Sequence, residues 1–219
     1  MVTGAGVSAA SGVPTFRGAG GLWRNRQAQQ LATPEAFAAD PRLVWEWYAW
    51  RRQVIAGCNP NPAHETIARW SERPGFSLIT QNVDGLHERA GTKHVTRYHG
   101  SIWTVKCWAD CGAADWEDFS VPLPELPPRC PACGALARPG VVWFGEAIPT
   151  AALAAAQAAT ACDVFLSVGT SSVVYPAAGL LAAARARGAF TVEVNPETTA
   201  SEVDVALPMA AEAALPLLG

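Results

Sequence analysis

Four of the six cysteines in the sequence form two close pairs, Cys107 with Cys111 and Cys130 with Cys133. Two such pairs separated by a loop are typical of a zinc ribbon, in which each pair supplies two thiolates to a tetrahedral ion. Because all four ligands would be protein atoms, we expect one structural zinc with no open position for catalysis. The alternative is that the four cysteines are reduced and hold no metal.

The start of the chain contains a turn built from small residues. Gly4, Ala5 and Gly6 follow the apolar end of a predicted strand and precede a predicted helix. Glycines let the backbone approach a phosphate, and a helix N-terminus offers N–H groups and the positive end of its dipole. The pattern therefore predicts a phosphate-binding turn, although turns of small residues are also common where no ligand binds.

Histidine is well suited to accept a proton near neutral pH, because its unperturbed pKa lies close to that range. The four histidines are His64, His87, His94 and His99. We expect His94 to be exposed. The residues alone do not decide which of the others acts as a base.

Strands and helices must bring these residues together. Apolar strands are predicted over residues 76–80, 163–168 and 190–194, and each ends in small or polar residues. Alanine-rich helices, such as one around residues 151–161, lie between strands. This alternation predicts an α/β fold with a doubly wound, Rossmann-like parallel sheet and ligand groups at its carboxyl edge.

A further helix is predicted over residues 43–55. Its periodicity places Tyr48 and Arg51 side by side, because residues three apart share a helix face. The simpler explanation of these residues is that Tyr48 belongs to the core and that Arg51, beside a second arginine, lies on a solvated face.

Composition excludes several classes of protein. Half of the 219 residues are apolar and 16% are charged, which excludes a disordered chain. The formal net charge of -3 gives no basic field for nucleic acid. Since the sequence shows no membrane span or export signal, we expect a cytoplasmic protein with no nucleic-acid or membrane partner, and a monomer as its simplest state.

Several short motifs resemble one known family. They are GAGVS at 4–8, SGVPTFR at 11–17, TQNVD at 80–84, HG at 99–100, VVWFGE at 141–146, GTSS at 169–172 and VNPE at 194–197. In this order, and with the two cysteine pairs, they closely resemble the sirtuins, the NAD-dependent protein lysine deacylases. The resemblance implies a Rossmann-like NAD-binding domain and a smaller domain made of a helical module and a zinc ribbon. The expected ranges are 1–22, 72–104 and 139–219 for the first, and 23–71 with 105–138 for the second.

The resemblance also implies roles for the site residues. His99 would be the catalytic base. The Asp84 carboxylate would accept a hydrogen bond from the nicotinamide carboxamide, and a loop carrying Phe16 and Arg17 would close over the nicotinamide. The expected NAD-binding residues are Gly4, Ala5, Gly6, Phe16, Arg17, Gln81, Asn82, Asp84, Gly169, Thr170, Ser171 and Asn195.

The segment YAWR, from Tyr48 to Arg51, resembles the Tyr-x-x-Arg signature of class III sirtuins, which include desuccinylases and demalonylases. A succinyl or malonyl group ends in a carboxylate, and burying that charge requires a partner such as an arginine and a hydroxyl donor. The resemblance therefore favours an acyl-carboxylate pocket at Tyr48 and Arg51. The acylated peptide is expected to add as an extended strand. The residues expected to bind it are Val142, Phe144 and Gly145.

The implied function is removal of succinyl or malonyl groups, and also of acetyl groups, from protein lysines, giving nicotinamide and O-acyl-ADP-ribose. One alternative is a deacetylase or ADP-ribosyltransferase without a preference for acidic acyl groups. A dinucleotide-dependent oxidoreductase fits less well, because no second strand ending in an acid follows the turn by about twenty residues. A zinc-ribbon NAD sensor without activity would leave His99 idle.

Overall fold

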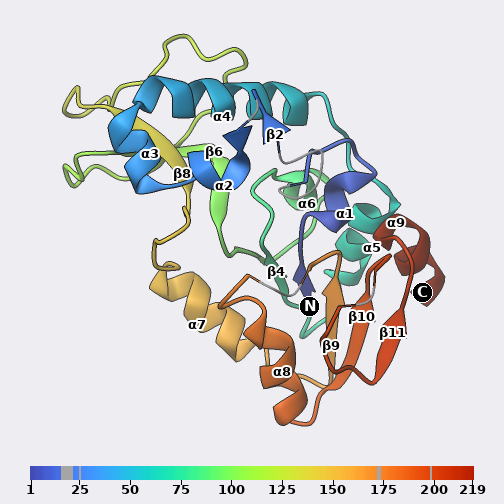
Figure 1. The fold of residues 1–219 in the computed structure, drawn as a ribbon. Coiled ribbons are helices and arrows are strands. Elements are labelled where there is room, and N and C mark those ends of the chain that lie inside the picture. Colours follow the sequence, from blue (N-terminus) through green and yellow to red (C-terminus); the bar gives the residue numbers. More distant parts are fainter. Residues whose placement is uncertain (16–21, 25, 172–173, 198) are drawn as a thin grey trace.

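The computed structural model describes residues 1–15, 22–24, 26–171, 174–197 and 199–219. Its largest sheet has six parallel strands in the order β11-β10-β9-β1-β4-β5 (Figure 1). These strands are β1 (Val2–Thr3), β4 (Leu78–Thr80), β5 (Val95–Arg97), β9 (Val164–Val168), β10 (Phe190–Val194) and β11 (Val205–Leu207). The predicted α/β fold with a Rossmann-like parallel sheet is confirmed.

The order of the strands creates a crevice beside β1. From β1 the chain runs to β4 and β5 on one side, and later returns to β9, β10 and β11 on the other. In doubly wound sheets, ligands bind where the winding reverses, outside the carboxyl ends of the strands. Here that position lies between β1 and β9, which pair through Thr3 and Val168.

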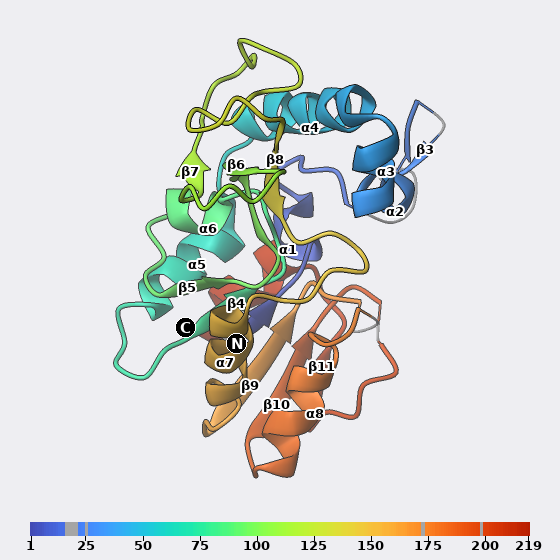
Figure 2. The ribbon, with the colours of Figure 1, turned by 90° about the vertical axis from the view of Figure 1, so that its left-hand side faces the viewer.

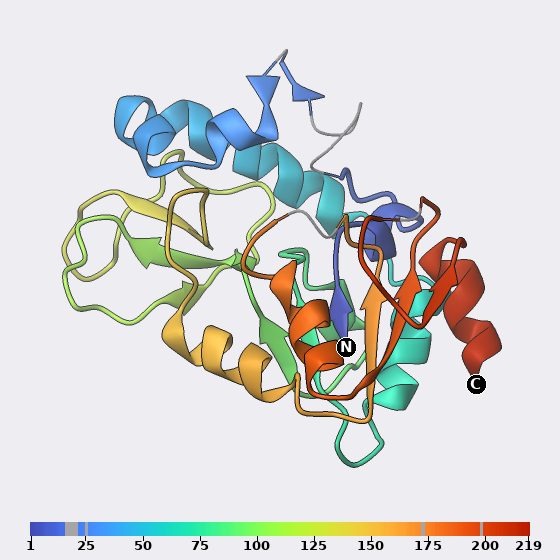
Figure 3. The ribbon, with the colours of Figure 1, turned by 60° about the horizontal axis from the view of Figure 1, so that its bottom comes forward.

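Helices cover both faces of this sheet, and each face has its own apolar core (Figure 3). Ile67 and Leu215 lie in one core, and Ala156 and Leu181 lie in the other. The first face is covered by α1 (Gly6–Ala9), α5 (Pro62–Trp70), α9 (Ala211–Ala214) and the 3-10 helix Leu215–Leu218, and the second by α7 (Thr150–Ala158) and α8 (Gly179–Ala186). The layers are therefore helix, sheet and helix, as a doubly wound sheet requires.

A second group of elements lies above the carboxyl edge of the parallel sheet (Figure 2). Its antiparallel sheet has the order β7-β6-β8, and a separate pair of strands joins β2 to β3. These elements are β2 (Leu22–Trp23), β3 (Arg26–Gln27), β6 (Gly100–Cys107), β7 (Trp116–Glu117), β8 (Ala137–Val141), α2 (Ala28–Leu31), α3 (Pro34–Ala39) and α4 (Pro41–Ala56), while α6 (Leu86–Arg89) follows β4. The expected division of the chain into two domains stays a prediction.

The start of helix α4 carries two sequence signals for a helix N-terminus, a capping residue and a proline. Pro41 occupies its first turn, and the Asp40 side chain caps it by accepting from the Leu43 N–H at 2.9 Å. Its buried face packs on β6 and β8, where the indole N–H of Trp45 donates to the Ala137 carbonyl at 2.7 Å. The predicted helix over 43–55 therefore lies inside α4, with its position fixed by the antiparallel sheet.

The predicted strands agree with the observed strands within a few residues. The prediction for 190–194 matches β10, while β9 begins one residue later than predicted and β4 covers only the last part of 76–80. The alanine-rich stretch forms α7. Among the described residues, none of the helices combines the length and the apolar character that a membrane crossing requires.

Candidate active site and metal centre

A cavity of about 740 Å³ lies at the carboxyl edge of the parallel sheet. Its walls come from the turns after β1, β4, β9 and β10, from α4, and from the segment after β8. It brings together the predicted residues Gly4, Ala5, Gly6, Tyr48, Arg51, Gln81, Asn82, Asp84, His99, Val142, Phe144, Gly145, Gly169, Thr170, Ser171 and Asn195. Two further predicted residues, Phe16 and Arg17, lie outside the described residues.

The turns after β1 and β9 touch backbone to backbone. A Cβ on Gly6 would lie 2.8 Å from the Cα of Gly169, and one on Gly4 would lie 2.8 Å from the Gly169 carbonyl oxygen. The Gly6 N–H donates to that same carbonyl at 2.8 Å. Glycine is therefore needed here for the approach of one turn to the other, and the Gly6 N–H is already bonded within the protein. The close approach shapes the floor of the cavity.

Ser8 joins the first turn to the segment after β4. Its hydroxyl donates to Asp84 Oδ2 at 2.8 Å, accepts from Asn82 Nδ2 at 3.1 Å, and lies 3.3 Å from His64 Nε2. The other Asp84 oxygen accepts from the Leu86 N–H at 2.8 Å. Burial raises the pKa of Asp84, although the hydrogen bonds from Leu86 and Ser8 oppose that rise. Asn82 and Asp84 are thus held in fixed orientations at the cavity wall.

One ring nitrogen of His99 forms a hydrogen bond within the protein. Its Nδ1 lies 3.2 Å from the carbonyl oxygen of Gln81. Because a carbonyl only accepts, we assign the proton to Nδ1, which leaves a lone pair on Nε2. Burial lowers the pKa of His99, and the hydrogen bond with Gln81 partly offsets this change. The imidazole is therefore neutral at pH 7, with one nitrogen able to accept a proton.

The other histidines lie in different environments. His64 and His87 are almost completely buried, and burial lowers their pKa values to about 3 and about 4. Both rings hydrogen-bond to hydroxyls of the core, His64 to Ser8 and His87 to Thr3. His94 is exposed, as predicted. Of the four histidines, only His99 lines the cavity. Without the family resemblance, the sequence did not distinguish His99 from the other histidines.

Tyr48 and Arg51 reach the cavity from the buried face of α4. They are 1% and 4% exposed, so the explanation of Arg51 as a solvated residue is wrong. The Tyr48 hydroxyl accepts from the indole N–H of Trp143 at 2.9 Å, and burial raises its pKa to about 12. Burial lowers the pKa of Arg51, while nearby Tyr48 and Asp84 oppose that change. A guanidinium stays charged nonetheless, so the pocket offers a neutral hydroxyl and a positive charge together.

The segment after β8 forms another wall of the cavity. The N–H groups of residues 142–144 donate to His99 O, Glu146 Oε2 and Ala32 O at distances of 2.9, 2.8 and 2.9 Å. A bound peptide therefore cannot use these three amides without displacing bonds within the protein. The Trp143 carbonyl also accepts, from the Glu146 N–H at 3.0 Å. Among the described contacts, the carbonyls of Val142 and Phe144 and the amide of Gly145 are the groups left for pairing with a peptide strand, which narrows the predicted peptide edge.

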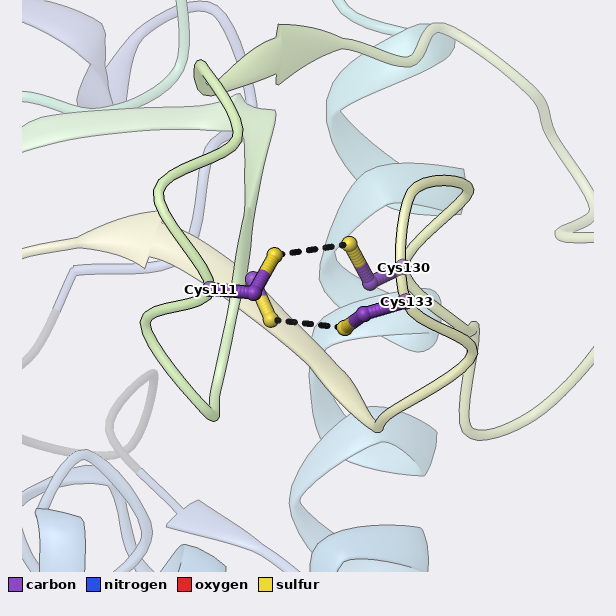
Figure 4. A group of neighbouring side chains, drawn as sticks. Cys111, Cys130 and Cys133 are labelled. Carbon is purple, nitrogen blue, oxygen red and sulfur yellow. Dashed lines mark hydrogen bonds between the residues drawn. The ribbon is translucent and has the colours of Figure 1, made fainter.

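The predicted cysteine pairs meet on facing loops. Figure 4 shows Cys111 facing Cys130 and Cys133 across a small gap. All four sulfur atoms lie within 4.8 Å of one another, at 3.6 Å for Cys107 and Cys133 and 3.8 Å for Cys111 and Cys130. A tetrahedron of sulfurs at a Zn–S distance of about 2.3 Å has edges of about 3.8 Å. The four sulfur atoms are therefore close enough together to hold one zinc ion.

Most of the cavity residues and all four cysteines lie within one stretch of the chain that matches a known family. The sequence profile of the Sir2 family matches residues 4–176. The chain belongs to the Sir2 family. The matched range contains the turns after β1, β4 and β9, the helix α4 and the four cysteines.

Curated relatives of this Sir2 chain are similar over most of their length. A protein of Aquifex aeolicus named NAD-dependent protein deacylase is 55% identical over 200 residues, which are 90% of this chain and 83% of that protein. A protein of Pseudomonas aeruginosa named NAD-dependent protein deacylase 1 is 54% identical over 210 residues, covering 90% of this chain and 82% of that protein.

Solved Sir2 structures share the whole fold. A Sir2 homologue in complex with NAD has a TM-score of 0.93 and 45% identity, covering 99% of this chain and 86% of that chain. A substituted Sir2 homologue in complex with 2′-O-acetyl ADP ribose has a TM-score of 0.92 and 46% identity, covering 99% of this chain and 88% of that chain.

Sequence reasoning did not single out two residues of the Sir2 site. Ser8 hydrogen-bonds to both Asn82 and Asp84, and Trp143 hydrogen-bonds to Tyr48. Ser8 lies in the motif GAGVS and Trp143 in the motif VVWFGE. Their positions within these motifs were the signal in the sequence that could have identified them. Their partners were not predictable, because these contacts join segments far apart in the chain.

Proposed function

We propose that this Sir2 protein is an NAD-dependent protein lysine deacylase that prefers succinyl and malonyl groups. One observation carries the preference: Tyr48 and Arg51 lie buried side by side in the cavity that also contains His99. The names of the relatives support deacylation in general. The acyl preference rests on the pocket.

Charge distinguishes the acidic acyl groups from acetyl. An acetyl group is apolar at its end and needs no polar partner, whereas a succinyl or malonyl group brings a carboxylate into a buried site. An ionised carboxylate without a partner is strongly disfavoured in an apolar environment. The Arg51 guanidinium compensates that charge, and the Tyr48 hydroxyl adds a hydrogen bond. A pocket for acetyl groups alone would not require a buried arginine.

The residues proposed to hold NAD are those of the turns at the carboxyl edge, where doubly wound sheets bind dinucleotides. They are Gly4, Ala5, Gly6, Gln81, Asn82, Asp84, Gly169, Thr170, Ser171 and Asn195. The volume of the cavity and its glycine-lined floor fit such a ligand. When bound, NAD would supply an electrophilic ribosyl carbon, which would form a bond to the acyl carbonyl oxygen as its bond to nicotinamide breaks. The rigid Asn82 and Asp84 orient the nicotinamide end.

His99 is proposed to act as the general base. Its Nε2 accepts a proton from a ribose hydroxyl, while Nδ1 stays bonded to the Gln81 carbonyl and fixes the plane of the ring. The backbone carbonyl of His99 also holds the Val142 amide, which ties the base to the proposed peptide edge. The proposed products are nicotinamide, O-acyl-ADP-ribose and the free lysine.

Zinc has a structural role in this proposal. The four cysteines, of which Cys107 ends β6 and the others follow on loops, do not line the cavity. A zinc ion held by four thiolates has no open position for a substrate. We further propose the domain ranges expected from the sequence, with residues 105–138 as the ribbon and 23–71 as the helical module beside it.

The proposal is tested by incubating the protein with NAD and one peptide carrying succinyl-, malonyl- or acetyl-lysine, and following all products by mass. We expect free lysine peptide, nicotinamide and O-acyl-ADP-ribose, with faster turnover of the two acidic acyl groups. Transfer of ADP-ribose to protein, or equal turnover of all three peptides, would favour the alternative without acidic-acyl preference. A reduced cofactor would indicate an oxidoreductase, and the absence of any product would indicate a sensor.

A further inference from the structure

Trp143 connects the segment after β8 to the proposed acyl pocket. Its side chain is 2% exposed, and its indole N–H donates to the Tyr48 hydroxyl at 2.9 Å, across 95 positions in the sequence. The role proposed above for Tyr48 does not account for this bond. Tyr48 reaches the cavity because it lies on the buried face of α4, and that position does not require the hydrogen bond from Trp143.

Two charged residues hold Trp143 in place. The Arg138 guanidinium lies over the indole, with its Cζ 3.4 Å from the ring centre. Arg138 Nη2 donates to Glu146 Oε2 at 2.9 Å, and the same oxygen accepts from the backbone N–H of Trp143 at 2.8 Å. Arg138 Nη2 also donates to the Val141 carbonyl at 3.0 Å. The indole is therefore fixed through both its ring face and its backbone.

This ion pair is largely removed from water. The side chains of Arg138 and Glu146 are 5% and 23% exposed. Burial by itself would raise the pKa of Glu146, but the hydrogen bonds from Arg138 and Trp143 and the charge of Arg138 hold that pKa below its usual value. Glu146 therefore stays ionised at neutral pH, and its bidentate pairing with Arg138 restricts the segment between the two residues.

The bond from Trp143 decides where the Tyr48 proton can point. An indole N–H only donates, so the Tyr48 oxygen is the acceptor in this bond. A phenol has a single proton of its own. The Arg51 guanidinium beside it is also a donor and cannot accept that proton. Among the residues that the structure describes, none accepts a hydrogen bond from the Tyr48 hydroxyl, and Tyr48 lines the cavity.

We propose that Trp143, fixed by the Arg138–Glu146 pair, is a positioning residue for acyl specificity, which turns the Tyr48 hydroxyl into a donor aimed at the carboxylate of an acidic acyl group. This inference rests on the proposed function. It separates two parts of carboxylate recognition: Arg51 provides the charge, and Trp143 orients the hydroxyl. An acetyl group has no carboxylate and gains nothing from this arrangement.

The test uses Trp143→Phe, which keeps an aromatic ring beneath Arg138 and removes the N–H. The values of kcat/KM are measured for succinyl- and acetyl-lysine peptides of identical sequence. We expect the succinyl-to-acetyl ratio to fall about fivefold, the effect of losing one neutral hydrogen bond. Tyr48→Phe should give a similar fall. The double variant should fall no further, because Trp143 acts through Tyr48.

Trp108→Phe is the matched control. Trp108 also lies near the Arg138 guanidinium, at 5.8 Å, but it makes no hydrogen bond to Tyr48 among the described contacts. It should keep the wild-type ratio. An unchanged ratio in Trp143→Phe, or multiplied effects in the double variant, would overturn the role of Trp143 while a wild-type preference for succinyl-lysine still supports the proposed function. A succinyl-to-acetyl ratio near one in the wild type would overturn both the role of Trp143 and the proposed acyl preference.

Discussion

At the scale of single residues, the supply of donors and acceptors decides what each side chain can do. The Gln81 carbonyl selects the tautomer of His99, and the Trp143 indole selects the direction of the Tyr48 proton. The same rule separates the other two buried histidines: His64 and His87 hydrogen-bond to the Ser8 and Thr3 hydroxyls and do not line the cavity. The sequence contains four histidines, and their surroundings place only His99 at the cavity.

Replacing His99 by alanine should lower deacylation by about 10²–10⁴-fold, because a positioned base is lost. NAD binding, measured by calorimetry, should remain close to that of the wild type, since the turns that line the cavity do not change. His94→Ala removes an exposed histidine and serves as the control, with full activity expected. Wild-type turnover in His99→Ala would exclude His99 as the base.

Replacing Arg51 by alanine should weaken use of succinyl-lysine far more than use of acetyl-lysine. A buried carboxylate that loses its charged partner is destabilised by roughly 2–5 kcal/mol, and about 1.4 kcal/mol corresponds to tenfold. The succinyl-to-acetyl ratio of kcat/KM should therefore fall by more than an order of magnitude. Arg42→Ala, at an exposed position of the same helix, should leave the ratio unchanged. An equal fall for both substrates would show that Arg51 does not read the carboxylate.

At the scale of elements, the site depends on how closely neighbouring turns approach. The turn after β1 and the turn after β9 meet without any side chain between them, and the N–H of Gly6 bonds directly to the Gly169 carbonyl. Gly169 has a φ of +59°, and a Cβ there would lie 2.5 Å from the Val7 nitrogen. Even a methyl group at Gly169 would therefore disturb the contact between these two turns at the centre of the sheet.

Gly169→Ala should destabilise the protein by more than about 2 kcal/mol, since the unfavourable φ costs about 1 kcal/mol and the clash adds to it. Gly188→Ala is the matched control: its φ is +91°, but nothing lies within 4 Å of the added Cβ. Its cost should stay near 1 kcal/mol. Thermal unfolding compares the two, at about 2–4 °C per kcal/mol for a protein of this size. Equal melting temperatures would show that the two turns can separate freely.

At the scale of the whole molecule, two buried histidines and the four-cysteine cluster affect the overall stability. The ribbon joins two loops of an otherwise small antiparallel sheet through its four cysteines. Helices α5 and α6, in turn, each contain a buried histidine, His64 and His87, whose charged form burial disfavours. Metal and pH should therefore each change the free energy of unfolding of the protein.

The purified protein should contain one zinc per chain, and Cys130→Ala should lose that zinc together with thermal stability, because zinc binding contributes directly to folding. Elemental analysis and thermal unfolding measure the two effects. Cys162→Ala changes a cysteine outside the cluster and should keep the full zinc content. Freshly purified protein without zinc would refute the assignment of the ribbon.

Stability should decrease as the pH falls below 6.5. The pKa values of His64 and His87 are lowered from 6.5 to about 3 and about 4 in the folded protein, so the unfolded chain binds more protons in this range. Their stabilising contribution is complete above pH 6.5 and is lost toward pH 4, at up to about 1.4 kcal/mol per pH unit for each histidine. Unfolding in urea between pH 7 and 5 measures the slope. It should become shallower in His87→Gln and stay unchanged in His94→Gln.

The sequence by itself determined the fold class, the helix that carries Tyr48 and Arg51, the four cysteines and the motifs that resemble the sirtuins. These features depend on local spacing, such as partners three positions apart on a helix or apolar runs that end in small residues. Local spacing is available from the sequence because it reflects the geometry of neighbouring residues.

Only the tertiary structure decided which residues face one another. It placed His99 rather than His64 or His87 at the cavity, buried Arg51, and joined Trp143 to Tyr48. It also showed that the Gly6 N–H bonds to Gly169 and that the amides of residues 142–144 are already used. These outcomes depend on contacts between segments far apart in the chain, where burial and the competition for donors are set by packing that no local pattern records.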